Sequence, residues 1–502
     1  MLFSIILLSS IFWMRSTVDF RGWSFFESSV MVLLIKTLRQ QQKIVPPPRP
    51  LLIPILALTL WSACSSLWSP NFHATLTGIY KLFFFITAWT LFYTSRDYWE
   101  NSLGTACLAL CALGSLSLLL YPSWIDYPNL FSAFLSIGLT LAIDSYLQNS
   151  GFKAAFYAGL TVLLSFALLK LLALASILAA GAGATFLMFY HPEKSAKKIL
   201  QLCGLALLAS ILFYVSTGYD PLHALHNRKL QDPFAWERLY IWQDSLRMLL
   251  SHPWKGVGLG GFRDIYPAFK SIPGLRNAPY AHNEALNLLC ELGFVGMGIL
   301  LWWLYNVWRN QKSPDINLTV RYRWIAVEIT ILVCALFDFN LHYPPVLTLS
   351  ICGLVQIVPL SELDSRLEWK GGNVIIFFLS AFALLNLAPG LADTAFRIMY
   401  SNPKTRAKTA LWLRFIDPFN SLYYAQTGRM RDLLIAIELE PRNVWYRREA
   451  AQFYLRSWQQ SNDKNDLLSA DKEYANILNL APGVLPLEKE AAAIKKILVQ
   501  NP

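Results

Sequence analysis

The residues best suited to chemistry in this 502-residue chain lie around His282. This histidine is followed by Asn283 and Glu284, and a long apolar stretch begins directly after them. An imidazole titrates near pH 6.5, so it can accept a proton from a substrate hydroxyl at neutral pH. A capping or interfacial histidine is the alternative interpretation. The position therefore makes His282 a candidate general base at a boundary between water and an apolar segment.

Cations surround this position in the sequence. Residues 218–283 contain eight Arg and Lys residues, of which Arg238 and Arg263 lie beside aromatic or glycine-rich turns. A guanidinium group binds phosphate oxygens as a fork, so both are candidates for binding a phosphorylated substrate, with a solvated loop surface as the alternative. Lys81 lies inside an apolar stretch and Lys170 lies between two of them. A charge within a membrane is a functional candidate, and snorkelling to the headgroups is the alternative for both lysines.

Glycines lie on both sides of the histidine. Gly256, Gly258 and Gly260 come before it, and Gly293 and Gly296 come after it. A dinucleotide-binding loop would need a preceding strand and a βαβ context, and the sequence has neither. We interpret the first three glycines as a tight turn that brings backbone N–H groups and neighbouring cations close to the membrane surface.

Membrane helices must position these residues. Hydrophobic residues make up 55% of the chain and charged residues only 15%, with a mean hydropathy of +0.38. Ordinary soluble domains are about 25% charged. This composition excludes a soluble globular enzyme, a fibrous protein and a disordered chain. We expect an all-α polytopic membrane protein with about 12–13 transmembrane helices. The apolar stretches lie roughly at residues 1–14, 23–38, 51–68, 75–93, 102–120, 128–147, 152–169, 171–190, 198–217, 284–308, 324–342, 345–360 and 373–395.

The net charge of +11 fits such a protein without nucleic acid as a partner. Fifteen Lys and Arg residues fall in one set of short loops and three in the other set. The rule that positive loops stay inside places the amino terminus in the cytoplasm and the loop 218–283 on the outer face. With an odd number of spans, the tail also lies outside.

Two domains are expected from this pattern. Residues 1–396 form the membrane domain and residues 397–502 form a soluble tail. Two tail helices each end in a Leu-x-Pro sequence, at Pro441 and Pro482, as in loosely spaced tetratricopeptide-like hairpins. The seven cysteines lie in apolar stretches without metal-type spacing, so we expect no metal site.

These motifs together resemble the O-antigen ligase and polymerase-like family of bacterial envelope glycosyltransferases. The resemblance covers most of residues 50–360. Its most specific part is His282-Asn283 followed by Gly293 and Gly296 at the spacing of the family's ligase motif. The other matching sequences are Arg238-x3-Trp242, Pro253-x2-Gly256-Val-Gly258-x-Gly260-x-Phe262, Tyr127-Pro128-Asn129 and Asp338-Phe339-Asn340-Leu341-His342-Tyr343-Pro344.

The resemblance implies transfer of a glycan from a polyprenyl-diphosphate lipid, such as undecaprenyl diphosphate, to an acceptor hydroxyl outside the bacterial inner membrane. His282 would act as the base and Arg238 as the second catalytic residue. Arg263, Lys170, Lys81 and Asn283 would bind the diphosphate or substrate. Many members carry Ser-Arg where this chain has Leu169-Lys170. A lysine there keeps the charge but loses the fork, which puts efficiency or donor choice in doubt.

The same resemblance implies no cofactor and no metal. The acceptor would be another glycan, lipid A core or a protein, so a ligase of lipopolysaccharide biosynthesis and a polysaccharide polymerase both remain open. Membrane lipids are expected partners, and the tail is expected to bind a partner protein or a bulky acceptor. A transporter is a competing interpretation, but it predicts matching sequence halves, and none is visible. A scaffold with an inert histidine loop is a further alternative.

Overall fold

The structure is a computed structural model. It describes residues 20–41, 43–44, 47–121, 128–231, 236–272, 278–310, 317–358, 367–368, 372–399, 403–482 and 485–500. The apolar stretch expected at residues 1–14 and the matching residue Tyr127 lie outside these residues.

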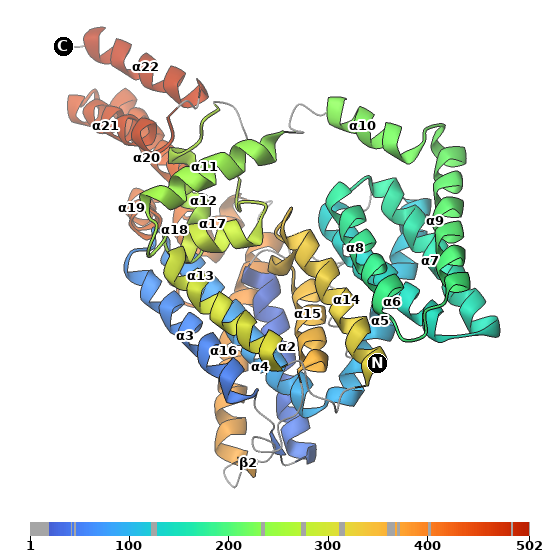
Figure 1. The fold of residues 1–502 in the computed structure, drawn as a ribbon. Helices are drawn as coiled ribbons and strands as arrows, with labels where there is room; N and C mark the ends of the chain where they lie inside the picture. Colours follow the sequence, from blue (N-terminus) through green and yellow to red (C-terminus); the bar gives the residue numbers. More distant parts are fainter. Residues whose placement is uncertain are drawn as a thin grey trace.

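Helices dominate the described chain (Figure 1). The first part contains α2 (Phe20–Gln41), α3 (Arg49–Cys64), η1 (Ser65–Leu67), α4 (Phe72–Thr94), α5 (Arg96–Leu120), α6 (Pro128–Gln148), α7 (Gly151–Leu171), α8 (Leu174–Tyr190) and α9 (Ala196–Thr217). The loop expected at 218–283 contains α10 (Pro221–Gln231), α11 (Glu237–Ser251), α12 (Phe262–Ile265) and η3 (Tyr266–Ala268). The next part contains α13 (Glu284–Asn310), α14 (Leu318–Ala335), η4 (Asn340–His342), α15 (Pro344–Ile357) and α16 (Gly372–Ile398).

Seven helices among the described residues are long and apolar enough to cross a membrane. They are Arg49–Leu67, Phe72–Thr94, Tyr98–Leu120, Pro128–Gln148, Gly151–Leu171, Ala196–Thr217 and Glu284–Asn310. Two shorter apolar helices are Leu174–Tyr190 and Pro344–Ile357. These helices confirm the expected class, an all-α protein that crosses the membrane several times. The count of 12–13 spans and the side on which each loop lies stay predictions.

The two ends of the helix bundle differ in what covers them. Helices α10, α11 and α12 lie at one end, which we call the loop end (Figure 1). The opposite end carries a two-residue antiparallel pair, β1 (Lys43–Ile44) with β2 (Leu367–Glu368), and we call it the strand end. This pair joins the segment after α2 to the segment before α16, two helices that also pack along each other. The candidate site lies at the loop end.

Helix α6 forms the centre of a closely packed unit with α8 and α14. One of its faces carries polar side chains one turn apart, at Ser132, Ser136, Thr140 and Asp144. The hydroxyl of Thr140 lies 2.9 Å from that of Thr330 on α14. Gly183 on α8 faces both, and a Cβ there would come within 2.2 Å of the Thr330 hydroxyl oxygen. Small and hydroxyl-bearing residues let membrane helices approach closely, so this face fixes the three helices together.

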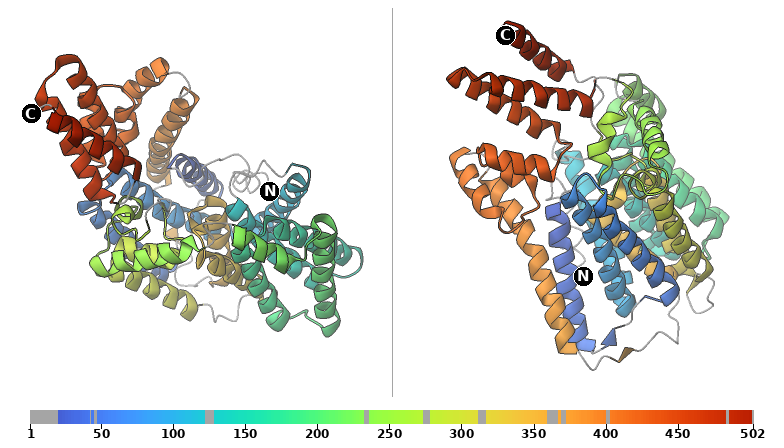
Figure 2. Two further views of the ribbon diagram at one scale, coloured as in Figure 1. Left: turned by 90° about the horizontal axis from the view of Figure 1, so that it is seen from above. Right: turned by 90° about the vertical axis from the view of Figure 1, so that its left-hand side faces the viewer.

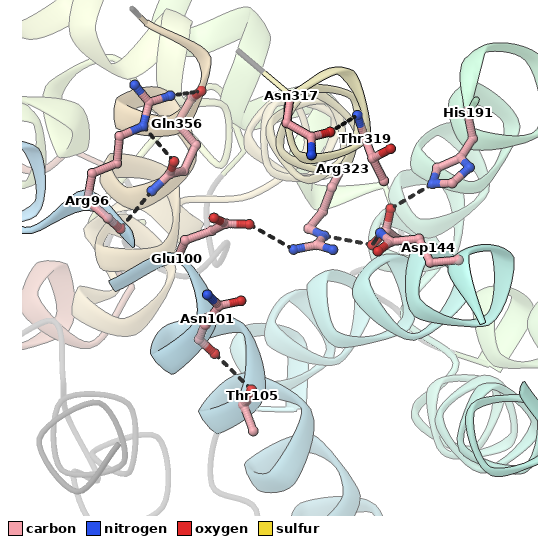
Figure 3. A network of polar contacts seen from close by, with 11 residues as sticks. Arg96, Glu100, Asn101, Thr105, Asp144, His191, Asn317, Thr319, Arg323 and Gln356 are labelled. Atoms are coloured by element: carbon pink, nitrogen blue, oxygen red, sulfur yellow. Dashed lines mark hydrogen bonds and ion pairs between the residues drawn. The ribbon is translucent and has the colours of Figure 1, made fainter. Parts of the chain in front are cut away.

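A polar network joins five helices at the strand end (Figure 3). Asp144 of α6 accepts a hydrogen bond from Arg323 Nε of α14 at 2.7 Å, and Arg323 also bonds Glu100 of α5 at 3.0 Å. His191, which follows α8, lies 3.2 Å from the other Asp144 oxygen. Beside this group, Arg96 of α5 donates to Gln356 of α15 at 2.7 Å. Arg96 and Arg323 are among the cations that the sequence places in the positively charged loops. In the structure they connect helices.

The tail continues from α16 as a series of helices that pack on their neighbours in order. They are α17 (Pro403–Leu413), α18 (Ser421–Ala425), α19 (Met430–Leu439), α20 (Val444–Ser461), α21 (Lys464–Leu480) and α22 (Leu485–Gln500). Figure 2 shows them at the loop end of the molecule. The tail contacts the start of α4, where His73 Nε2 lies 3.2 Å from Asp417 and the rings of Phe72 and Phe419 pack together. The tetratricopeptide-like assignment and the boundary at residue 397 stay predictions.

Candidate active site

His282 lies in a strained backbone position immediately before α13. Its φ is +51°, in the left-handed region that residues other than glycine rarely adopt. This conformation costs about 1–2 kcal/mol for a residue with a Cβ. The ring packs edge-on against Phe339, with the ring centroids 5.1 Å apart. Strain of this kind persists only where surrounding contacts hold it, and it is frequent at functional sites.

Asp338 joins His282 to Arg238. Its Oδ1 lies 3.0 Å from His282 Nδ1, and its Oδ2 accepts a hydrogen bond from Arg238 Nη2 at 3.0 Å. Burial alone would raise the pKa of Asp338, but the hydrogen bond to His282 and the charge of Arg238 outweigh it and hold that pKa below its usual value. The carboxylate is therefore ionised at neutral pH and accepts a hydrogen bond from the Nδ1–H of His282.

This arrangement leaves the other ring nitrogen of His282 for a substrate. Nε2 has no protein partner among the described residues, and 23% of the side chain is exposed. Arg238 is also accessible, with 35% of its side chain exposed. A neutral imidazole whose Nδ1 donates to a carboxylate presents a basic Nε2, which is the arrangement a general base needs.

A second carboxylate–imidazole pair lies beside the first. Glu284 Oε2 lies 3.4 Å from His342 Nδ1, and Glu284 Oε1 accepts a hydrogen bond from the Leu341 amide at 2.9 Å. The Tyr280 ring meets His342 edge-on at 4.3 Å and packs on Phe339 at 4.9 Å. Phe339 therefore contacts both His282 and Tyr280 and separates the two pairs.

Lys81 of α4 belongs to this second group. Its ammonium lies 5.9 Å from the centre of the Tyr280 ring. The charges of Glu291 and Glu284 both act on it. Along α4, Lys81 lies eight residues beyond His73, or about 12 Å deeper in the bundle. The structure thus brings Lys81 into the same cluster as the residues that flank His282.

Helix α13 is broken at Gly293, whose φ of 66° and ψ of −170° are not helical. The break frees backbone carbonyls that water cannot reach inside a membrane, so the protein must supply donors for them. The amide of Val257 donates to the Cys290 carbonyl and the amide of Gly258 donates to the Glu291 carbonyl, both at 2.9 Å. The glycine turn is therefore the hydrogen-bonding partner of the broken helix.

The other groups around the break are also satisfied. The Trp61 indole of α3 donates to the Leu292 carbonyl at 3.0 Å. Beyond the break, the Phe294 amide donates to the Pro253 carbonyl at 2.8 Å. Gly296 lies one turn further, where a Cβ would come within 2.4 Å of the Leu292 side chain. The break is thus held from both sides by the loop and by α3.

The three glycines of the turn are required by close backbone approach. Gly256 has a φ of +66°, and a Cβ there would lie 2.4 Å from the Glu291 carbonyl. Gly258 and Gly260 also have positive φ, and a Cβ on Gly260 would lie 2.8 Å from the Ala74 carbonyl of α4. The turn is wedged between α4 and α13, and two of its amides point at α13 carbonyls. This geometry supports the structural interpretation of the glycines rather than a phosphate cradle.

Asn283 lies next to His282, but both ends of its amide are engaged inside the protein. Its Nδ2 donates to the Leu336 carbonyl at 3.0 Å, and its Oδ1 accepts from the Leu286 amide at 2.9 Å. It therefore caps α13 and ties that helix to the end of α14. This placement favours support of the histidine over direct substrate binding.

The described contacts do not bring Arg263 or Lys170 to His282. Arg263 is exposed on α12, and its charge acts on Tyr446 of the tail. Lys170, in the last turn of α7, lies 5.6 Å from the Phe166 ring and 5.9 Å from the Phe213 ring of α9. Both residues are at the loop end, but the site is built around other cations, Arg238 and Lys81.

Three residues of this cluster were not assigned as site residues from the sequence. They are Asp338, Glu284 and His342. The available signal was the sequence Asp338–Pro344, which resembles a family motif although its chemistry was not interpreted. Within the described part of the chain, no three His, Cys, Asp or Glu side chains converge as a metal site would require.

The fold and this cluster define a multi-pass membrane protein with a histidine–carboxylate–arginine site at one end of its bundle. Residues 154–301 match the sequence model of the O-antigen ligase family. This match includes Arg238, the glycine turn and His282, and it confirms the resemblance over that part of the chain. It supports a glycosyltransferase role of the ligase or polymerase type. The chain matches no curated protein.

Proposed function

We propose that this protein transfers a glycan from a polyprenyl-diphosphate carrier to an acceptor hydroxyl on the outer face of the bacterial inner membrane. The observation that carries the proposal is the contact of Asp338 with both His282 and Arg238, at 3.0 Å each. Two of these three residues lie in the segment that matches the O-antigen ligase family. A base oriented by a carboxylate beside a guanidinium suits glycosyl transfer from a phosphate leaving group.

The reaction follows from this arrangement. His282 Nε2 takes the proton of the acceptor hydroxyl as its oxygen attacks the anomeric carbon. The bond between that carbon and the diphosphate oxygen breaks, and the electron pair leaves with the diphosphate. Asp338 stabilises the imidazolium that forms. A direct displacement of this kind inverts the anomeric configuration.

The leaving diphosphate needs positive charge. Arg238 uses one N–H to bond Asp338 and keeps others for phosphate oxygens, because a guanidinium has five N–H donors. Lys81 is the second cation of the cluster, whereas Arg263 and Lys170 would have to act from further along the loop end. We propose that these cations make the transfer independent of a metal ion.

A small apolar hollow lies between α3, α4 and α13, one to two helical turns deeper along α4 than Lys81. It is lined by Pro47, Leu51, Leu52, Ile55, Phe85, Ile86, Trp89 and Trp303. We propose that the polyprenyl chain of the donor runs along this apolar part of the bundle, with its diphosphate near Lys81.

The choice between ligase and polymerase depends on the acceptor. We favour a ligase or oligosaccharyltransferase acting on a bulky acceptor, because the tail covers part of the loop end where the acceptor would arrive. A polymerase that joins repeat units is the second candidate, because the family match covers both types.

The test is transfer in membranes that lack the endogenous enzyme, with a lipid-linked glycan as donor and a chelator present. His282→Ala and Arg238→Ala should abolish transfer, and Arg263→Ala should reduce it. His252→Ala and Arg247→Ala are matched controls from the same loop and should transfer normally. Transfer that survives in His282→Ala, or that stops with chelator in wild type, would contradict the proposal. The size distribution of the product then separates a ligase from a polymerase.

A further inference from the structure

Two carboxylate–imidazole pairs connect the same two segments of the chain in opposite order. In the first pair, His282 before α13 meets Asp338 of the turn after α14 at 3.0 Å. In the second pair, Glu284 at the start of α13 meets His342 of the same turn at 3.4 Å. Phe339 lies between them and contacts the ring of His282. The site therefore holds two oriented imidazoles, one on each segment, and the transfer uses only the first.

The second imidazole is also oriented by a carboxylate, at a longer distance than the first. Glu284 is fixed by the hydrogen bond from the Leu341 amide to its Oε1, which leaves Oε2 for His342 Nδ1. The Tyr280 ring meets His342 edge-on at 4.3 Å. No partner for Nε2 of His342 is recorded among the described residues, and 18% of this side chain is exposed. One ring nitrogen is again held by a carboxylate while the other can reach a ligand.

The charges that face His342 come from two helices and the preceding loop. Glu284 and Glu291 of α13 both act on it. Lys81 of α4 lies over the Tyr280 ring, and Tyr280 itself contacts His342. Two carboxylates thus balance one ammonium and the imidazole. His282, in contrast, has one carboxylate partner, which it shares with Arg238.

We propose that His342 is the general acid of the transfer, donating its Nε2 proton to the diphosphate oxygen as that oxygen leaves the sugar, with Glu284 as its positioning residue. This inference rests on the proposed function. The acceptor proton moves to His282, the bond from the anomeric carbon to the acceptor oxygen forms, and the bond to the diphosphate oxygen breaks. The released oxygen takes the His342 proton. Solvent then restores both histidines, so that atoms and charge balance over one turnover.

A proton from His342 would neutralise the charge that develops on the leaving group. When the sugar leaves, its phosphate oxygen acquires a charge, and the second ionisation of a phosphate monoester lies near pH 6. An imidazolium held beside that oxygen can supply its proton as the charge develops. General acid catalysis by a positioned side chain contributes about 10²- to 10⁴-fold in rate.

The test measures release of farnesyl diphosphate from a farnesyl-diphosphate-linked disaccharide by the full-length protein in nanodiscs, with an acceptor-bearing membrane extract. His342→Gln keeps the size of the side chain, and Glu284→Gln keeps the acceptor for the Leu341 amide. We expect His342→Gln to release the lipid at least 100-fold more slowly and to lose the fall in rate at alkaline pH. Glu284→Gln should release the lipid less slowly than His342→Gln. Its rate should still fall at alkaline pH, but at a different pH from wild type.

Imidazole added to the alanine variants separates the two roles. Rescue of His342→Ala should follow the imidazolium form and decrease as the pH rises. Rescue of His282→Ala should follow neutral imidazole and increase with pH. A His342→Gln rate within twofold of wild type overturns the inference, as does a reduced rate that keeps the alkaline fall or an His342→Ala variant that imidazolium does not rescue. If His282→Ala is fully active, the proposed function itself fails.

Discussion

Among the described residues, an Asp, a His and an Arg side chain meet at each of the two ends of α14. At the loop end, Asp338 contacts His282 and Arg238 at 3.0 Å each. At the strand end, Asp144 contacts His191 at 3.2 Å and Arg323 at 2.7 Å (Figure 3). In each trio the two carboxylate oxygens divide between the imidazole and the guanidinium. The residue types in a trio therefore do not show which of the two could take part in catalysis.

Access and the free lone pair distinguish the two trios. His191 and Asp144 are 0% and 1% exposed, whereas 23% of the His282 side chain is exposed. His191 Nδ1 accepts a hydrogen bond from the Glu193 amide at 3.1 Å, so the lone pair of this nitrogen is already engaged. His282 instead directs Nδ1 to its carboxylate and keeps Nε2. The strand-end trio can only hold helices together, and the loop-end trio can bind a substrate.

Asp338→Asn should produce the largest difference between the two trios. The amide would no longer hold the Nδ1–H tautomer of His282, and loss of the corresponding carboxylate in a serine protease triad lowers kcat about 10⁴-fold. We expect transfer to fall at least about 10³-fold with a small change in melting temperature. Single-turnover transfer measures the first quantity and intrinsic fluorescence of the 18 tryptophans measures the second. A loss of less than tenfold would mean that Asp338 does not orient the base.

Asp144→Asn should act on stability instead of rate. It leaves Arg323 with Glu100 as its only remaining carboxylate among the described contacts. Breaking a buried ion pair from one side costs about 3–5 kcal/mol. We expect a clearly lower melting temperature in detergent and a normal transfer rate per folded molecule. Ser145→Ala on the same helix is the control. A stable but inactive Asp144→Asn protein would show that the two ends are coupled through α14.

Gly293→Ala tests whether the loop-end trio depends on the broken helix. A φ of 66° with a ψ of −170° is a conformation essentially reserved for glycine, and alanine there costs about 1–3 kcal/mol. Its Cβ would also lie 2.2 Å from the Trp254 carbonyl, so the start of α13 must move. A shift of about 1 Å in a reacting group lowers a rate about 10²-fold. We expect such a loss in transfer, while Gly298→Ala, with nothing within 4 Å of its Cβ, should behave as wild type.

Asp264→Asn should have the smallest effect, and it tests whether the tail is coupled to the loop end. Burial raises the pKa of Asp264, beside Arg263 and near tail residues, to about 6. A carboxyl with a raised pKa stabilises the fold below its ordinary pKa, and this contribution is lost as the pH rises through about 6. We expect the substitution to raise the melting temperature at pH 8 and not at pH 4. Glu449→Gln, exposed on α20, should change neither. An equal effect at both pH values would contradict the raised pKa.

Local patterns made much of the fold predictable. Apart from residues 1–14, which lie outside the described residues, the expected apolar stretches fall largely on helices, because length and hydropathy are properties of short segments. The stretch expected at 324–342 runs past the end of α14 at Ala335 into a turn. The start of α13 at Glu284, directly after the His282-Asn283 sequence, was predictable for the same reason. The break at Gly293 was not, because its hydrogen-bonding partners lie on α3 and on the loop after α11.

The site was predictable in part. His282 and Arg238 were chosen as candidates from their types and neighbours. The carboxylate that contacts both is 56 and 100 residues away, at a distance no local pattern spans. Arg323 was interpreted as one of many loop cations that set orientation, and its partner Asp144 is 179 residues away. Arg263 and Lys170 were chosen for their charge and sequence position, which do not determine what a side chain faces.

The broken helix also has a consequence for the order of biogenesis. Every partner that satisfies its freed carbonyls, from Trp61 to the turn at Val257 and Gly258, precedes α13 in the chain. Because a membrane protein is synthesised from its amino terminus, these donors have already emerged when the segment around Gly293 enters the bilayer. The non-helical conformation at Gly293 can then form with its hydrogen-bond donors already present. A circular permutant that makes α13 before α3 would have to insert that break without them.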